Sequence, residues 1–178
     1  MNTAYPIIPL EGNTVVLSEL ADIMIETVAA GGSVSFMHPL DRAIALAFWQ
    51  ASLAAAARGE RVVLGAYDGA LLVATVSLLL DCPPNQPHRG EIAKLMTRLS
   101  HRRRGIARAL MLEAERIAVA RGRTLLNLDT AVEDGAAGLY DGLGYRRTGI
   151  IPDYALKPHG GLTGTIIFWK SIGAGART

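Results

Sequence analysis

Residues 102–111 read RRRGIARALM, three adjacent arginines followed by a glycine and then by small and apolar side chains. Adjacent like charges repel each other and glycine lowers helix stability, so this order is unfavourable at the start of an amphipathic segment. A bound anion would offset that cost, because the first N–H groups of a helix lack acceptors within the helix and lie at the positive end of its dipole. Gly105 would let the backbone approach an anion closely. We therefore predict a phosphate-type anion site at 101–108 instead of a solvated basic loop.

The segments on either side predict that this stretch connects a strand to a helix. EIAKLMTRLS at 91–100 is typical of a strand, and 105–121 repeats apolar residues with helical period until Gly122 ends the pattern. TLLNLDTA at 124–131 predicts a second strand, parallel to the first because a helix crosses between them. The basic stretch then lies at the carboxyl end of the first strand.

The rest of the chain predicts further helices and strands around this unit. Asn13 is the expected N-cap of the first helix, Pro39 is expected in the first turn of the second, and Asp68-Gly69 is a hairpin signal between two β-rich runs. The expected helices cover 13–31, 39–58 and 133–144, and the expected strands flank residue 68 and cover 145–156 and 163–172. Together these elements predict a mixed α/β sheet covered by helices.

The composition favours one domain with a substantial core. The chain has 178 residues, 50% of them hydrophobic and 19% charged, and we expect a single domain over 1–172 with a flexible tail at 173–178. The formal net charge is only +2, so the anion site must be a local cluster and nucleic-acid binding is not expected. The single cysteine, Cys82, favours a reducing compartment, and no apolar run is long enough to cross a membrane. We expect a cytoplasmic protein.

The order of Arg102, Gly105 and Ala107 resembles the signature of a known family. Arg102-x-x-Gly105-x-Ala107 is similar to the Gln/Arg-x-x-Gly-x-Gly/Ala motif of the GNAT superfamily of N-acetyltransferases. The resemblance covers nearly the whole chain, through EIAKLM, ARALM, LLNLDT, GLYDGLGY and IPDYALKP…TIIFWK. The stretch ETVAAGGSVSFM resembles, more specifically, the tabtoxin-resistance branch of that superfamily.

This resemblance implies an α/β fold of the GNAT acyl-CoA N-acyltransferase type. Such a fold has a mixed, mostly antiparallel sheet with a splayed central pair of parallel strands, flanked by about four helices. It implies acetyl-CoA as cosubstrate, with the diphosphate over 102–108 and the pantetheine arm against the edge of a bulged strand. The residues implied in cofactor binding are Met96, Thr97, Arg102, Arg103, Arg104, Gly105, Ile106, Ala107 and Arg108.

Four positions depart from the family pattern. Arg103 and Ala107 stand where glycines are common, and Leu99 stands where a proline is often found. Glu133 takes the place of an asparagine that is often near CoA, and we assign no cofactor contact to it because a carboxylate would not bind phosphate. The first three changes leave the backbone amides of the loop available.

The resemblance also implies three catalytic residues. Tyr140, on the short glycine-rich helix, corresponds to a tyrosine that faces the acetyl sulfur, where a phenol can protonate a departing thiolate. Glu91 and Asp129 are the base candidates, and either carboxylate needs a water relay or a raised pKa to take a proton from an ammonium. The plain structural alternatives are a core aromatic for Tyr140, a helix cap for Asp129 and a surface position for Glu91.

The sequence therefore predicts an N-acetyltransferase that moves an acetyl group from acetyl-CoA to the amine of a small molecule by direct attack. A tabtoxin-like toxin or antibiotic is the acceptor that the resemblance implies; another amine, such as an aminoglycoside or polyamine, and a non-catalytic acyl-CoA-binding module are the alternatives. The four histidines and Cys82 lack ligand spacing, so no metal is expected. Apolar residues around Trp169 and the terminal strands favour a homodimer.

Overall fold

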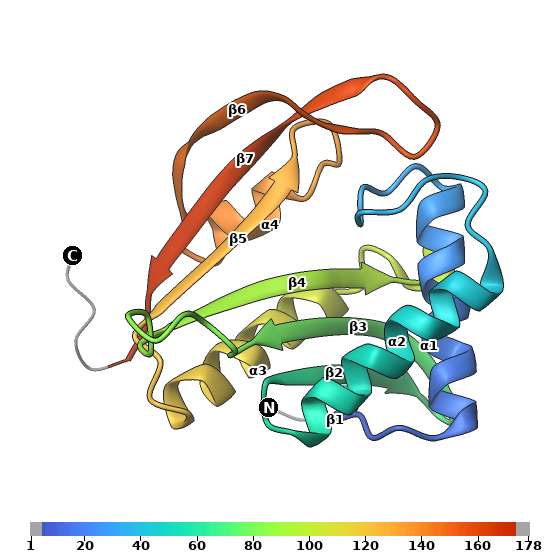
Figure 1. The fold of residues 1–178 in the computed structure, drawn as a ribbon, viewed down its shortest axis with the longest axis horizontal. Coiled ribbons are helices and arrows are strands. Elements are labelled where there is room, and N and C mark those ends of the chain that lie inside the picture. The colour runs from blue at the N-terminus through green and yellow to red at the C-terminus, as the bar shows by residue number, and fades with distance from the viewer. Residues whose placement is uncertain (1–4, 174–178) are drawn as a thin grey trace.

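The computed structural model describes residues 5–173, which form one mixed sheet of seven strands with helices on both faces (Figure 1). The strand order is β1-β2-β3-β4-β5-β7-β6, and every neighbouring pair is antiparallel except β4 and β5. The predicted α/β architecture is confirmed. In chain order the elements are β1 (Ile7–Pro9), α1 (Thr14–Ala29), α2 (Arg42–Ala57), β2 (Arg61–Asp68), β3 (Leu71–Leu79), β4 (Arg89–Thr97), the 3-10 turn η1 (Leu99–His101), α3 (Ile106–Ala120), β5 (Leu125–Ala131), α4 (Ala137–Gly142), β6 (Arg146–Leu156) and β7 (Leu162–Ser171).

The helix starts follow local capping residues. Asn13 caps α1, as predicted, by accepting a 2.9 Å hydrogen bond from the N–H of Val16. The second helix begins at Arg42 and not near Pro39, because the carboxylate of Asp41 accepts a hydrogen bond within the first turn and so caps the helix there. Pro39 lies in the loop that connects α1 to α2, which makes this loop longer than predicted.

Helices cover both faces of the sheet (Figure 1), and each face has its own hydrophobic core. On the face covered by α1 and α2, Leu20 and Trp49 are completely buried. On the face covered by α3 and α4, Leu110 and Phe168 are completely buried. Full burial of a large apolar side chain contributes about 1.5–3 kcal/mol, so the two layers hold the central strands firmly in place.

A β-bulge interrupts β4 in the middle of the sheet. Ala93 pairs with Ser77 and Met96 with Thr75, so two residues of β4 lie opposite one residue of β3. Lys94, at φ +53°, is the residue that takes up the extra length. The bulge also reverses the alternation of side chains, since Ile92 packs in the α3 core and Met96 in the α1–α2 core. The bulged strand that the family resemblance implied is therefore present.

The parallel strands β4 and β5 separate soon after they meet (Figure 1). They pair only at Arg89 with Leu125, Gly90 with Leu126 and Glu91 with Asn127. Beyond these pairs, the edges of Ile92–Thr97 and Leu128–Ala131 that face each other share no strand pairing. This unpaired region, which we call the splay, confirms the predicted splayed pair.

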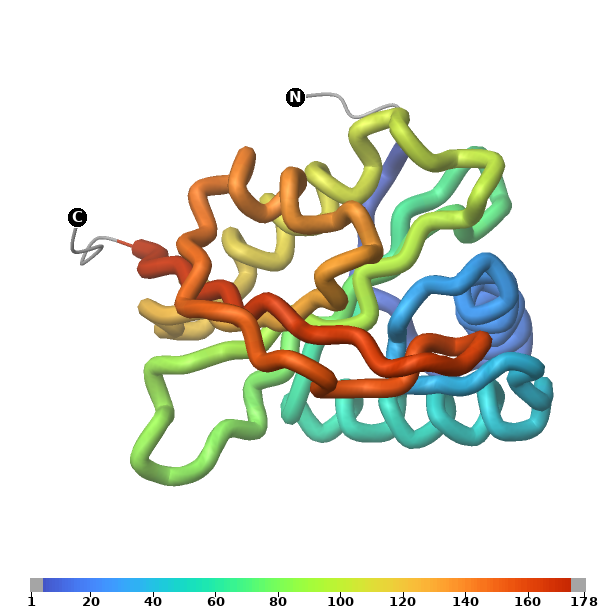
Figure 2. Tube along the Cα trace, turned by 90° about the horizontal axis from the view of Figure 1, so that it is seen from above, coloured from blue at the N-terminus to red at the C-terminus, as the bar shows by residue number. Residues whose placement is uncertain are grey.

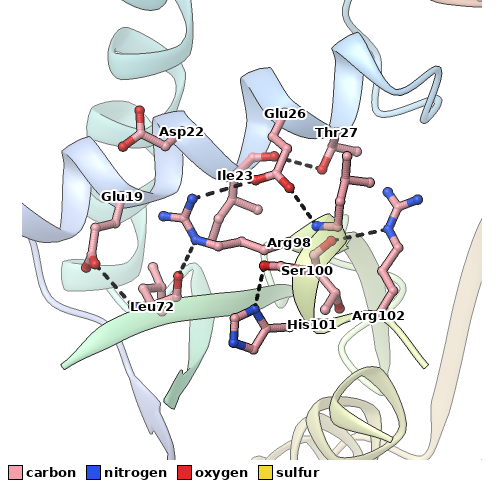
Figure 3. Close-up of polar contacts among 12 residues, drawn as sticks. Glu19, Asp22, Ile23, Glu26, Thr27, Leu72, Arg98, Ser100, His101 and Arg102 are labelled. Carbon is pink, nitrogen blue, oxygen red and sulfur yellow. Dashed lines mark hydrogen bonds and ion pairs between the residues drawn. The ribbon is translucent and has the colours of Figure 1, made fainter. Parts of the chain in front are cut away.

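The turn between β4 and α3 is anchored to α1 and β3 (Figure 3). Glu26, in the last turn of α1, accepts a 2.6 Å hydrogen bond from the N–H of Leu99 and pairs at 3.6 Å with the guanidinium of Arg98. Arg98 in turn donates to the carbonyl oxygen of Leu72 at 2.8 Å. A proline in place of Leu99 has no N–H and could not make the bond to Glu26, so this departure from the family pattern has a structural role.

The same turn contains two left-handed residues, Arg103 at φ +62° and Gly105 at φ +79°. Glycine adopts this conformation freely, whereas any residue with a Cβ atom is strained by about 1–2 kcal/mol. Arg103 therefore keeps the backbone shape that the family glycine would adopt, at a cost in stability.

The edge strand β6 exposes several apolar side chains, among them Ile150, Ile151 and Tyr154. Trp169 is half-buried instead, and the guanidinium carbon of Arg146 lies 5.6 Å from its ring centroid. The homodimer stays a prediction that rests on β6 and no longer on Trp169.

Residues 1–4 and 174–178, at the two chain ends, lie outside the described residues. Apart from Gly173, the predicted flexible tail at 173–178 lies outside the described residues. Between residues 5 and 173, no helix is both long enough and apolar enough to cross a membrane.

Substitution of Arg103 tests the strain in the turn. Arg103→Gly should raise the free energy of unfolding by about 0.5–1 kcal/mol, because relief of the left-handed strain exceeds the added entropy of the unfolded chain. Arg103→Ala is the matched control, since it removes the same charge and keeps the Cβ atom. Urea unfolding of the three proteins measures the difference; an equal gain in both variants would attribute it to charge repulsion.

Substitution of Glu26 tests the anchor. Glu26→Ala should accelerate hydrogen exchange at the amide of Leu99 and lower stability by about 1–3 kcal/mol, because it leaves the N–H and Arg98 without their partner. Asp22→Ala is the control, since Asp22 lies on the same helix and pairs with Arg42 of α2. Unchanged exchange at Leu99 in Glu26→Ala would show that the anchor does not hold the turn.

Candidate active site

The turn before α3 presents a row of free backbone amides. Among residues 5–173, no acceptor pairs with the N–H groups of Arg103 to Arg108; the helical pattern begins with the 3.1 Å bond from Ala109 to the carbonyl oxygen of Gly105. Gly105 is the N-cap, and a glycine has no side chain to satisfy these donors. The row lies at the positive end of the α3 dipole and is suited to binding an anion; the anion site at 101–108 stays a prediction.

Three arginines in and beside the turn, Arg102, Arg104 and Arg108, donate hydrogen bonds to backbone carbonyl oxygens. Arg102 and Arg104 donate to carbonyl oxygens at the end of β4 and in η1, at 3.4 and 2.9 Å. Arg108 donates at 3.1 Å to the carbonyl oxygen of Gly142 and so connects α3 to α4. Each guanidinium has five N–H donors, so these contacts leave donors for an anion as well as holding the turn.

Met96 and Thr97 lie where β4 borders the splay. Their registered partners are Thr75 and Ala74 of β3, and they have no registered partner in β5. The Met96 side chain is buried in the α1–α2 core, so only the backbone at this position is available to a ligand. Backbone groups at a strand edge need hydrogen-bond partners, which an extended ligand with amide groups can supply.

Tyr140 is buried in the middle of α4, and the centroid of its ring lies 5.5 Å from that of Phe168 and 6.1 Å from that of Tyr145. Its hydroxyl makes no hydrogen bond within the described part of the chain. Burial, and then the negative charges of Asp129 and Asp134, raise the pKa of Tyr140 to about 12. The phenol is therefore protonated at neutral pH and can act as a proton donor.

The two carboxylate candidates differ in their surroundings. Asp129 lies on the part of β5 that pairs with β7 but not with β4. It accepts a 3.1 Å hydrogen bond from the hydroxyl of Thr165 and acts electrostatically on Tyr140. Glu91 lies at the last paired position and forms a 3.2 Å ion pair with Arg89. The structure therefore brings Asp129, and not Glu91, together with Tyr140, and Asp129 is the better base candidate.

Two charged residues of this region were missed from the sequence. Asp134 accepts a 3.2 Å hydrogen bond from the N–H of Ser33; burial raises its pKa, an effect that this hydrogen bond opposes. Lys94 projects from the bulge of β4 and donates a 3.0 Å hydrogen bond to the hydroxyl of Ser35. A lysine within the otherwise apolar run IAKLM at 92–96 was the available sequence signal for Lys94, whereas Asp134 had none.

The acceptor site is expected beside two loops, residues 31–40 between α1 and α2 and residues 152–161 around the β6–β7 turn, and these loops lie against each other (Figure 2). The N–H of His38, in the α1–α2 loop, donates to the carbonyl oxygen of Pro158 at 2.9 Å, and the rings of His38 and His159 lie 4.5 Å apart. Glu133 pairs with Lys157 of the β6–β7 loop at 3.1 Å. No group of three or more potential metal ligands occurs over residues 5–173.

Comparison with solved structures shows the same architecture in acetyltransferases. An N-acetyltransferase from Staphylococcus aureus Mu50 matches with a TM-score of 0.79 and 14% identity, over 94% of this chain and 99% of its own. The ribosomal-protein-alanine N-acetyltransferase from Brucella melitensis matches with a TM-score of 0.78 and 19% identity, over 93% and 99%. The Salmonella typhimurium protein yncA, solved with its cofactor acetyl-CoA, matches with a TM-score of 0.74 and 15% identity, over 96% of both chains. Identities this low indicate a common fold alone.

Comparison with family models goes further than the fold. The model described as "Acetyltransferase (GNAT) family" matches residues 25–145. This range contains the bulged strand, the row of free amides, the splay and the short helix of Tyr140. On this match, the chain belongs to the GNAT family of acetyltransferases.

Proposed function

We propose that this protein transfers an acetyl group from acetyl-CoA to the amine of a small molecule by direct attack. The observation that carries the proposal is the row of free amides at Arg103 to Arg108, which opens beside a splay bordered by Tyr140 and Asp129. A diphosphate fits these donors in charge and in hydrogen-bonding capacity. An extended amide-bearing arm fits the unpaired edge of β4.

Acetyl-CoA would be held by groups of three kinds. The amides of Arg103 to Arg108 would bind the diphosphate, and the guanidiniums of the turn would add charge. The backbone of Met96 and Thr97 would pair with the pantetheine amides. The left-handed turn at Arg103 and Gly105 would keep the amides in place before binding, which lowers the entropy lost on association.

Two side chains at the splay, Asp129 and Tyr140, would carry out the proton transfers of the reaction. Bound acetyl-CoA supplies the thioester whose carbonyl carbon the acceptor nitrogen attacks. Asp129 attracts the acceptor ammonium and receives its proton through a water molecule, because a carboxylate is too weak a base to take it in one step. As the C–S bond breaks, Tyr140, which its raised pKa keeps protonated at neutral pH, donates its phenolic proton to the departing sulfur, and CoA leaves as the thiol. The second proton that the nitrogen loses as the amide forms restores the phenol.

The acceptor class is proposed from the family resemblance. Segments 31–40 and 152–161 lie against each other, and we expect the acceptor amine to bind beside them. By its resemblance to the tabtoxin-resistance branch, a tabtoxin-like toxin or an antibiotic is the first acceptor to test, followed by aminoglycosides and polyamines. Action on such compounds fits the expected cytoplasmic location.

Release of CoA thiol in the presence of acetyl-CoA and a panel of small amines tests the proposal. We expect release with at least one amine at a rate well above that of acetyl-CoA alone. Isothermal titration with acetyl-CoA, run in parallel, identifies the alternative. Tight binding without thiol release from any amine would indicate an acyl-CoA-binding module and contradict the transferase.

Replacement of Tyr140 tests the proton donor. Tyr140→Phe should lower kcat by about 100-fold or more and leave the acetyl-CoA dissociation constant unchanged, because the phenol acts only on the departing sulfur. Tyr145→Phe is the matched control, since the hydroxyl of Tyr145 lies beside Glu115 on the α3 side. Because the pKa of Tyr140 is about 12, ionisation of this phenol should cause no loss of rate up to about pH 10. Equal kcat values for Tyr140→Phe and the wild type would reduce Tyr140 to a packing residue.

A further inference from the structure

Lys94 is held in an unusual position beside the splay. It is the bulge residue of β4, at φ +53°, and its ammonium donates a 3.0 Å hydrogen bond to the hydroxyl of Ser35. The same ammonium lies 5.6 Å from the centroid of the Phe48 ring. Lys94 therefore reaches from the sheet to the α1–α2 loop, which is one of the loops at the expected acceptor site.

Both partners of this hydrogen bond have a strained backbone. Ser35 adopts φ +72°, and within residues 5–173 the non-glycine residues at positive φ are Ser35, Lys94, Arg103 and Asp153. Each such residue costs about 1–2 kcal/mol unless the surrounding structure has a use for it. Strain on both sides of one contact indicates that the direction of the Lys94 side chain matters to the protein.

The ammonium of Lys94 has no ion-pair partner within 4 Å among the described residues. Burial lowers its pKa, and the charges of Asp129 and Glu91 oppose that effect from β5 and β4. Glu91 is already paired with Arg89, while Asp129 is bonded to the hydroxyl of Thr165. The splay thus contains a cation, Lys94, and a carboxylate, Asp129, that feel each other's charge but that each lack an ion-pair partner within 4 Å among the described residues. A half-buried charge of this kind gains stability when an opposite charge binds beside it.

We propose that Lys94 binds a carboxylate of the acceptor, so that the substrate is an amino acid or a similar compound with both an amine and a carboxylate. The inference rests on the proposed function and adds the substrate class to it. The acceptor amine lies towards Asp129 and the acceptor carboxylate towards Lys94 and Ser35. Polyamines and aminoglycosides, which carry only positive charges, are repelled by Lys94 and are poor acceptors.

Matched acids and amides test this assignment. CoA thiol release is measured with a panel of L-amino acids, including lysine and ornithine, each compared with its carboxamide. The wild-type protein should prefer the acid by about tenfold or more in kcat/KM, the size expected for a charge-assisted contact. Lys94→Gln should abolish that preference and leave kcat/KM for the amides nearly unchanged, and Lys94→Arg should retain most of it.

Folding of the variants is controlled by a second substitution. If Lys94→Gln does not fold, Lys94→Asn replaces it, because asparagine tolerates the left-handed backbone and is also neutral. The dissociation constant for acetyl-CoA, measured by titration, should be the same for the wild type and each variant, since Lys94 does not take part in the row of free amides.

Either of two results would overturn the proposal directly: the wild type uses the amides as well as or better than the acids, or the preference for acids survives in Lys94→Gln. A third result, a Lys94→Arg variant that is inactive on both acids and amides, would also overturn it, because it would identify Lys94 as the base.

Saturation-transfer NMR with the same acids and amides, with and without CoA, tests acceptor binding separately from the transfer reaction. Acid binding that Lys94→Gln abolishes, without turnover, would reject the transferase and support the carboxylate site. Turnover of simple amines without any preferential acid binding would reject the carboxylate site alone.

Discussion

The separation of β4 from β5 after three residue pairs is the constraint on which the site depends. Continuous pairing would satisfy the backbone groups of Met96 and Thr97 within the sheet and leave no edge for a ligand. Two features accompany the separation: the bulge at Lys94, which redirects the second half of β4, and the ion pair of Glu91 with Arg89 beside the last paired position. The cores on both faces of the sheet hold this arrangement open.

Backbone strain and charged side chains are concentrated around the splay and in the turn before α3. Arg103 and Lys94 each hold a left-handed backbone that glycine would adopt without cost, one in the turn before α3 and one beside the expected acceptor. Asp129 acts electrostatically on both Tyr140 and Lys94. The packed cores on the two faces of the sheet must offset the destabilisation at these positions, as is common where a rigid scaffold supports a strained site.

Local patterns in the sequence predicted most of the fold and part of the site. The Asp68-Gly69 hairpin, the Asn13 cap and the strand–helix–strand unit depend on residues near one another in the chain, and the structure contains all three. Asp134 and Lys94 depend on contacts with Ser33 and Ser35, which belong to a loop distant in sequence. The preference for Asp129 over Glu91 likewise depends on where the strand pairing stops. Neither kind of information is present in periodicity or spacing.

Amide NMR during titration with CoA measures the central claim most directly. If the row of free amides holds the diphosphate, the largest chemical-shift changes should fall on the N–H groups of Arg103 to Arg108, with smaller changes at Met96 and Thr97. Titration with pantetheine, which lacks the diphosphate, should still change the chemical shifts of the β4 amides but should no longer change those of the amides in the turn. Unchanged amides from Arg103 to Arg108 at saturating CoA would contradict the account.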